Sequence, residues 1–196
     1  MKNALSLLLR DVHTCTICES DLPLGPHPIF QLHPKASILI AGQAPGKKVH
    51  ESGIPFNDPS GDRLRDWLGV NRATFYDARK IAILPMGFCY PGTGKAGDRP
   101  PRHECAATWR APLLTHLSNI RLTLVIGQFA HAYHLHDSPY TTVTETVQAW
   151  KEFWPERLPL PHPSPRNNGW LKRNPWFATS LLPALRKHVQ AVLRTT

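Results

Sequence analysis

Four short apolar runs, separated by segments of helical character, constrain the fold of this chain more than any other feature. The runs cover residues 37–41, 81–84, 121–126 and 157–160, and their length and composition are typical of buried strands. Strands that alternate with helices form an open parallel sheet that is covered on both faces. We therefore predict an α/β fold with a central four-stranded parallel sheet.

The helical segments between these strands carry start and stop signals. Ser60 is the predicted N-cap of a helix that ends at Gly69. Pro112 and Pro183 fall inside two other helical segments, and Pro112 is expected to kink its helix. Apart from the helix between Ser60 and Gly69, helices are predicted at residues 3–11, 102–117, 127–135, 141–153 and 175–193.

Three long loops follow predicted strands and are the expected place for a functional site. They cover residues 42–60, 85–101 and 161–170. Ligands of open parallel sheets bind beyond the carboxyl ends of the strands, so these loops are expected to meet. The first loop does not match a phosphate-binding loop, because its Gly and Lys spacing is one residue short and Lys48 stands where Ser or Thr would bind magnesium.

Composition places the chain among folded globular proteins. Its 196 residues suffice for one domain, predicted over residues 1–196, and 41% of them are apolar against 19% charged. No run approaches the roughly 18 apolar residues of a membrane helix, and residues 1–10 lack the small-residue cleavage site of a signal peptide. We expect a cytoplasmic protein that acts as a monomer.

The positive charge is concentrated near the C-terminus. The net charge is +9, and residues 157–196 contain no Asp or Glu. The basic residues of this segment are Arg157, Arg166, Lys172, Arg173, Arg186, Lys187 and Arg194. Such a distribution is typical of a protein that binds a polyanion, and a solvated basic surface is the alternative.

The cysteines form two spaced pairs. Cys15 and Cys18 are separated by two residues, and Cys89 and Cys105 follow much later in the chain. Four thiolates suit tetrahedral zinc or an iron–sulfur cluster, and spacing alone does not choose between them. Four unrelated buried cysteines are the alternative.

Three motifs in this order resemble the uracil-DNA glycosylase superfamily, and within it the iron–sulfur branch of bacteria and archaea. Residues 42–46 read GQAPG, residues 53–56 read GIPF, and residues 162–165 read HPSP. The paired cysteines complete the pattern, which covers nearly the whole chain. The resemblance implies a three-layer α/β/α sandwich, a [4Fe–4S] cluster on the four cysteines with zinc as the alternative, and excision of a base from DNA.

The resemblance also assigns roles to individual residues. Phe56 would stack on a base flipped out of the helix, and His162 would donate a hydrogen bond to a ring oxygen of the departing base. Arg166 would fill the space that the base leaves. Gly42 is expected to contact the base, and Asn57, the polar residue after Phe56, is a candidate for a further base contact. Ser164 and Pro165 are expected to contact DNA, and the basic charge of the C-terminal segment adds Lys172 and Arg173 to the expected DNA contacts.

The chain departs from the family pattern at three places. Gln43 stands where the branch has Glu, His50 stands where an acidic residue is usual, and residues 81–88 contain no Asn to read the uracil edge. Gln43 can orient a water but cannot accept its proton as a carboxylate does. Asp58 and His50 are the candidates for activating that water. Two functions follow: a glycosylase for uracil or another deaminated base, or a catalytically weak or inactive iron–sulfur DNA-binding protein of the same fold.

Overall fold

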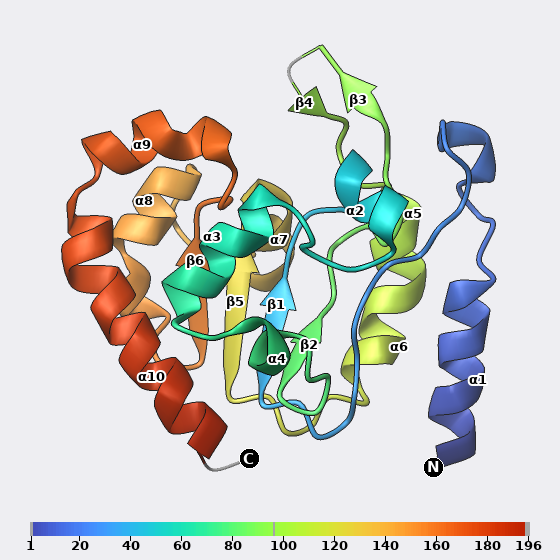
Figure 1. Ribbon diagram of the computed structural model, residues 1–196, viewed down its shortest axis with the longest axis horizontal. Helices are drawn as coiled ribbons and strands as arrows, with labels where there is room; N and C mark the ends of the chain where they lie inside the picture. Colours follow the sequence, from blue (N-terminus) through green and yellow to red (C-terminus); the bar gives the residue numbers. More distant parts are fainter. Residues whose placement is uncertain (1, 96, 195–196) are drawn as a thin grey trace.

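A four-stranded parallel sheet forms the centre of the molecule in the computed structural model, which describes residues 2–95 and 97–194. The strand order is β2-β1-β5-β6, and all three pairings are parallel (Figure 1). The strands are β1 (Ile38–Ala41), β2 (Ile81–Ile83), β5 (Leu122–Ile126) and β6 (Arg157–Leu160). The predicted α/β fold and its four strands are confirmed.

Alternate side chains of the strands enter two different cores. Ile38 and Ile40 of β1 join the core on one face, whereas Leu39 and Ala41 pack on the other. All four side chains are buried. Both faces of the sheet are therefore apolar, which explains why the strands read as continuous apolar runs.

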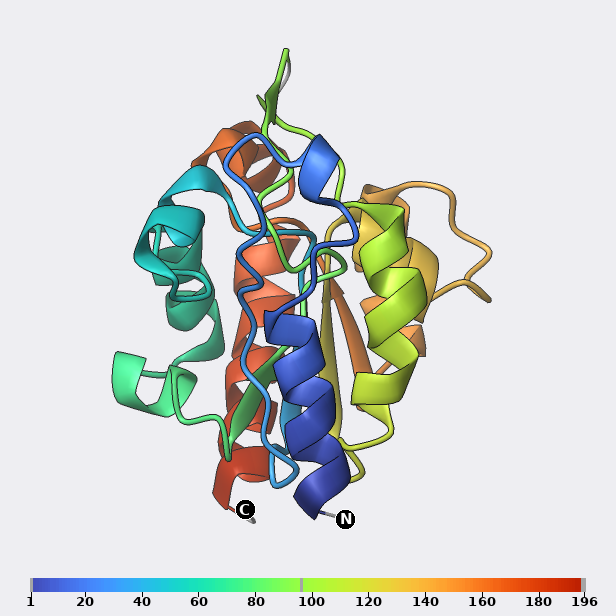
Figure 2. The same cartoon turned by 90° about the vertical axis from the view of Figure 1, so that its right-hand side faces the viewer.

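Helices cover both faces and complete the predicted three-layer sandwich. The face that carries Ile38 is covered by α3 (Pro59–Leu68), α8 (Val143–Gln148) and α10 (Leu182–Arg194). The other face is covered by α1 (Lys2–His13), α6 (Ala111–Leu114) and α7 (Gln128–His134). The helices α1 and α6 stand in front of the sheet when this side faces the viewer (Figure 2).

Shorter elements connect these layers. They are the helices α2 (Lys47–Ser52), α4 (Arg72–Phe75), α5 (His103–Cys105) and α9 (Asn168–Arg173), the strands β3 (Thr93–Gly94) and β4 (Gly97–Asp98), 3-10 turns at Glu19–Asp21, Trp150–Glu152 and Pro165–Asn167, and π-helical turns at Ala106–Arg110 and Phe177–Leu181. None of the described helices is long and apolar enough to cross a membrane.

Two details of the predicted loops are wrong. The loop over residues 42–60 contains α2, and the N-cap of α3 is Asp58 rather than Ser60. The Asp58 carboxylate accepts the backbone N–H of Gly61 at 2.9 Å, and Pro59 occupies the first helical position. Proline favours that position because its missing N–H would have no partner there, so the helix begins one residue before Ser60.

The other differences concern backbone that bends. Residues 85–101 contain the β3–β4 hairpin, where a purely irregular loop was predicted. The predicted helix over residues 102–117 is divided into α5, a π-helical turn and α6. Pro112 and Pro183 each follow a π-helical turn, because the wider turn accommodates the ring and the missing N–H donor.

A buried arginine holds the carboxyl end of β2. Arg110 is only 1% exposed and donates to the carbonyl oxygens of Leu84 and Pro85 at 2.9 and 3.1 Å. Its Nε also donates to Nε2 of His134 at 3.1 Å. Burial lowers the pKa of Arg110 to about 10 and that of His134 to about 3, and the charges of Arg110 and Arg157 lower the His134 pKa further. His134 is therefore a neutral acceptor near pH 7.

Acid should weaken the fold through His134. In the unfolded chain the His134 ring is protonated near its ordinary pKa of 6.5, whereas in the folded state it is protonated only near pH 3. The unfolded state thus binds more protons in this window, and the free energy of unfolding should decrease as pH falls from 7 to 5. Denaturant titrations of His134→Gln, which keeps an acceptor for Arg110, should show a shallower decrease.

His136→Gln is the matched control, because His136 is an exposed histidine on the same part of the chain. It should follow the wild-type pH dependence. If the free energy of unfolding changed with pH by the same amount in wild type and in His134→Gln, the role given to His134 would be contradicted.

Candidate functional site

The three loops predicted to meet do line one cleft at the carboxyl ends of the strands. Residues 42–46, 55–56 and 58 come from the first loop, and residue 85 and residues 97–101 come from the second. The third loop contributes His162, Ser164, Arg166 and Asn167. The cleft also includes Gln128 and Phe129 of α7, which sequence reasoning did not single out.

Phe56 lies in this cleft with a strained backbone. Its φ of 54° is in the left-handed region, which a bulky residue rarely adopts. The Phe56 carbonyl accepts from Nη1 of Arg65 and from the hydroxyl of Tyr76, both at 3.3 Å. The ring lies so close to Gly42 that a Cβ there would stand 3.4 Å from Phe56 Cζ. The ring is thereby held beside the first glycine of the GQAPG motif.

His162 follows β6 and presents a neutral ring to the cleft. Its Nδ1 accepts the backbone N–H of Ser164 at 3.2 Å, which leaves the proton of the neutral ring on Nε2. Burial lowers the pKa of His162, and the negative charges of Asp58 and Asp98 oppose that shift. Asn167 fixes the adjoining backbone by donating to the His162 carbonyl at 2.6 Å. His162 can therefore act as a fixed, uncharged hydrogen-bond donor.

Gln43 and Asp58 also lie in the cleft, and each has a structural contact. A Cβ on Gly127 would stand 2.9 Å from Cδ of Gln43, so the amide packs tightly against the start of α7. One oxygen of the Asp58 carboxylate is the N-cap acceptor of α3. Asp98 adds a carboxylate to the cleft lining that the sequence reasoning missed, although the loop that carries it was expected at the site.

Two residues predicted to act in catalysis or base binding, His50 and Asn57, are not among the residues that line the cleft. His50 lies on α2, with its ring centroid 5.0 Å from that of His27 and 6.1 Å from that of Tyr90. Burial lowers the pKa of His50, and His27 lowers it further. Asn57 faces α4, where its Oδ1 accepts from Nη2 of Arg72 at 3.1 Å.

The predicted DNA contacts fall on and beside the third loop. Ser164 caps the 3-10 turn at Pro165–Asn167 by accepting the backbone N–H of Arg166 at 3.2 Å. The guanidinium of Arg166 packs on Gly97 of the hairpin, where a Cβ would stand 2.1 Å from Nη1. Pro165 is exposed, and so are Lys172 and Arg173 in the last turn of α9.

The basic C-terminal segment does not form a single face. Arg157 stands at the amino end of β6, away from the cleft, and donates to the His134 carbonyl. Arg186 is engaged with Asp66 of α3. Within the segment, Arg166, Lys172 and Arg173 lie on the Pro165–Asn167 turn and on α9, which follows it.

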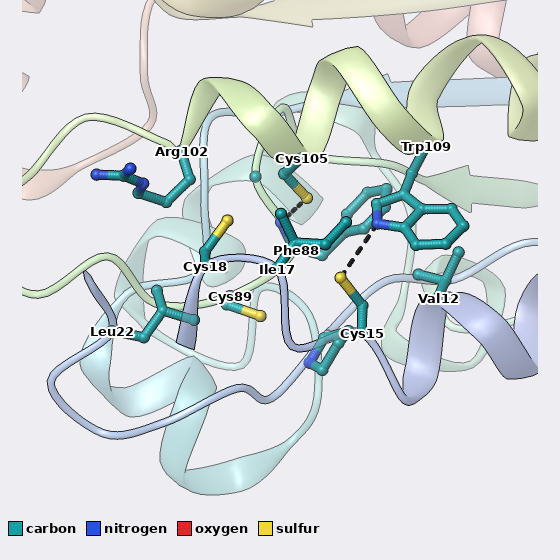
Figure 3. Close-up of a pocket in the computed structure, with 12 residues that line it drawn as sticks. Val12, Cys15, Ile17, Cys18, Leu22, Phe88, Cys89, Arg102, Cys105 and Trp109 are labelled. Carbon is teal, nitrogen blue, oxygen red and sulfur yellow. Dashed lines mark hydrogen bonds between the residues drawn. The ribbon is translucent and has the colours of Figure 1, made fainter. Parts of the chain in front are cut away.

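The four cysteines line a second pocket, separate from the cleft (Figure 3). Two of the sulfurs accept hydrogen bonds from nitrogen: Trp109 Nε1 donates to Cys15 and the Phe88 amide to Cys105, both at 3.3 Å. The Cys18 thiol instead donates to Oε2 of Glu104 at 4.0 Å. Nitrogen donors of the kind seen at Cys15 and Cys105 stabilise thiolates that serve as metal ligands.

Three of the thiols, those of Cys18, Cys89 and Cys105, are less acidic than a free cysteine. Burial raises the pKa of Cys105 to about 12, and it also raises the pKa values of Cys18 and Cys89. A bound metal would therefore have to displace their protons. Among the described residues, no three Cys, His, Asp or Glu side chains are arranged to hold a metal ion. The pocket thus collects four sulfurs without clustering them around one point.

The loop that carries Phe56 should be sensitive to Gly61. A Cβ on Gly61 would stand 1.7 Å from the Phe56 carbonyl oxygen, so Gly61→Ala must move that backbone. We expect a loss of about 1–3 kcal/mol of stability, as for other overpacked sites, measured by urea titration. Gly169→Ala is the matched control, because its Cβ would make an ordinary 3.5 Å contact with Arg173. Equal stability of the two variants would contradict the close approach.

The family of the chain follows from a match to a family model. The model described as the uracil DNA glycosylase superfamily matches residues 29–186. The match includes all three loops of the cleft, and it begins after Cys15 and Cys18. The chain therefore belongs to the uracil DNA glycosylase superfamily.

Proposed function

We propose that this protein is a DNA glycosylase that hydrolyses the N-glycosidic bond of uracil or another deaminated base. The observation that carries the proposal is the shared cleft of Phe56, His162 and Arg166. An aromatic face, a neutral donor and a cation beside one opening are what a flipped base and its DNA backbone require.

The chemistry is assigned from the positions of the side chains. The flipped base stacks on Phe56, and His162 donates its Nε2 proton in a hydrogen bond to a ring oxygen. Negative charge develops on that oxygen as the bond to the sugar breaks, and a fixed donor stabilises it most in the transition state. Gln43 orients the attacking water with its amide. Asp58 and His50 are the residues that the sequence offers for activating this water.

The DNA is held at the rim of the same cleft. Arg166 enters the space vacated by the base, with Ser164 and Pro165 fixing the turn that carries it. Lys172 and Arg173 contact phosphates on either side. We also propose that the protein acts as a monomer.

Loss of His162 should slow the reaction most. Deleting one fixed donor of this kind costs about 10²–10³ in rate, so His162→Ala should fall by that factor under single-turnover conditions. Gln43→Ala should lose less, because it removes only the positioning of water. The measurement is release of free base from single- and double-stranded oligonucleotides that contain uracil, hypoxanthine or xanthine.

His136→Ala is the control, because it removes an exposed histidine that does not line the cleft. Full activity of His162→Ala would contradict the mechanism. The glutamine at position 43 favours one alternative function, a DNA-binding protein without catalysis. Absence of base release by the wild type on all three bases would favour that alternative.

We also propose that Cys15, Cys18, Cys89 and Cys105 hold a [4Fe–4S] cluster. The support is their common pocket and the nitrogen donors beside the sulfurs of Cys15 and Cys105. A single zinc ion needs four sulfurs within about 2.3 Å of one point, whereas a cluster distributes its thiolates over several irons. Such a cluster would link the N-terminal segment to the segment between Cys89 and Cys105, a structural role.

Purified protein should therefore be brown and contain iron and sulfide. Cys18→Ala should lose iron and lower the melting temperature, while the preference among uracil, hypoxanthine and xanthine stays as in the wild type. Metal analysis and thermal unfolding of anaerobically prepared protein measure these effects. Stoichiometric zinc without iron would contradict the proposal.

A further inference from the structure

The β3–β4 hairpin brings a carboxylate into the cleft. The hairpin projects beyond the carboxyl end of the sheet (Figure 1), and it stands clear of the helices when seen from the side (Figure 2). Asp98 is the last residue of β4 and lines the cleft together with Gln43 and His162. Its Oδ2 lies 3.4 Å from the point where a Cβ on Gly46 would stand. The carboxylate thus lies against the loop that carries Gln43.

The base of the hairpin is anchored on both strands. The Arg99 amide donates to the Gly92 carbonyl at 2.8 Å, and the hydroxyls of Tyr90 and Thr93 are 2.5 Å apart. Gly92 has a φ of +94°, and a Cβ there would stand 2.9 Å from Cγ of Pro23. These contacts fix the base of the hairpin next to Asp98. A group that takes part in a reaction has to be held in position in this way.

The Asp98 carboxylate is free to act. Within residues 2–95 and 97–194, no hydrogen bond or ion pair engages its side chain. Asp58 differs, because one of its oxygens already accepts the Gly61 amide and caps α3. The negative charge of Asp98 acts on His162 in the same cleft, since it raises the pKa of His162 against the effect of burial.

The negative charge of Asp98 would be unfavourable in a protein that only binds DNA. The chain has a net charge of +9, and the guanidinium of Arg166 lies beside the neighbouring Gly97. A carboxylate at this place repels nearby phosphates and so weakens the attraction of a basic cleft for DNA. A role in the reaction gives a physical reason for a carboxylate here.

We propose that Asp98 is the carboxylate that acts at the reacting sugar, in place of the glutamate that Gln43 replaces; this rests on the proposed base excision. The C1′–N bond breaks, and its electron pair leaves with the base, whose oxygen is held by His162. Asp98 stabilises the positive charge left on the sugar. Water then bonds to C1′ and gives its proton to Asp98, which releases it to solvent, while the departing base takes a proton from solvent.

Asp98→Asn tests the proposal with two measurements, of reaction rate and of DNA affinity, that are expected to change differently. The rate of base release under single-turnover conditions should fall by about 10²–10⁴, the usual contribution of a group that transfers a proton. The affinity for the same uracil oligonucleotide should stay equal or increase, because a repulsive charge is lost. The Asn side chain has nearly the same shape, so the melting temperature should not change.

Asp66→Asn is the matched control. Asp66 has an exposed carboxylate on α3, with a side chain 75% accessible, and it does not line the cleft. Both its rate and its affinity should equal those of the wild type. Asp58→Asn, measured in parallel, compares the second carboxylate of the cleft, and an Asp58→Asn rate that falls while Asp98→Asn stays active would assign the role to Asp58.

The outcomes separate the two proposals. If the wild type releases base and Asp98→Asn does so at the same rate, the assignment of Asp98 is wrong and base excision stands. If Asp98→Asn loses rate, affinity and melting temperature together, its role is structural and the assignment is also wrong. If the wild type releases no base from any substrate, base excision itself fails and the assignment fails with it.

Discussion

The common direction of the four strands is the constraint on which the rest of the structure depends. Because β1, β2 and β6 all end at one edge of the sheet, the loops that follow them meet there. Phe56 on the first loop, Asp98 on the second and His162 on the third thus share a cleft although they are far apart in the sequence. Apolar burial on both faces holds this arrangement, since neither face of the sheet can turn toward water.

One helical segment connects the cleft with the cysteine pocket. Cys105, Trp109 and Arg110 lie along α5 and the π-helical turn that follows it. Trp109 contacts the sulfur of Cys15, whereas Arg110 binds the carbonyls at the end of β2 beside the cleft. The cysteine pocket and the cleft thus share one short segment of the chain, and the buried charge of Arg110 makes its backbone contacts costly to lose.

Much of this arrangement could be predicted from local sequence. The apolar runs predicted the strands, Gly69 predicted the end of α3, and the GIPF and HPSP motifs predicted that Phe56 and His162 would lie in one site. The prediction of Ser60 as an N-cap was wrong because two acceptable caps stand close together, and the proline between them decides which one is used. The β3–β4 hairpin was missed because its strands have two residues each and no apolar alternation.

The sequence by itself determined where strands and helices follow one another along the chain and which three loops form the cleft. These features depend on apolar patterns and turn residues that span only a few positions. Only the tertiary structure decided that Asp98 shares the cleft with His162, that His50 and Asn57 lie outside the cleft lining, and that the sulfurs of Cys15 and Cys105 accept hydrogen bonds from nitrogen donors. These contacts join residues from separate elements. Their distances depend on how the helices and loops pack around the sheet, and no local pattern in the chain encodes that packing.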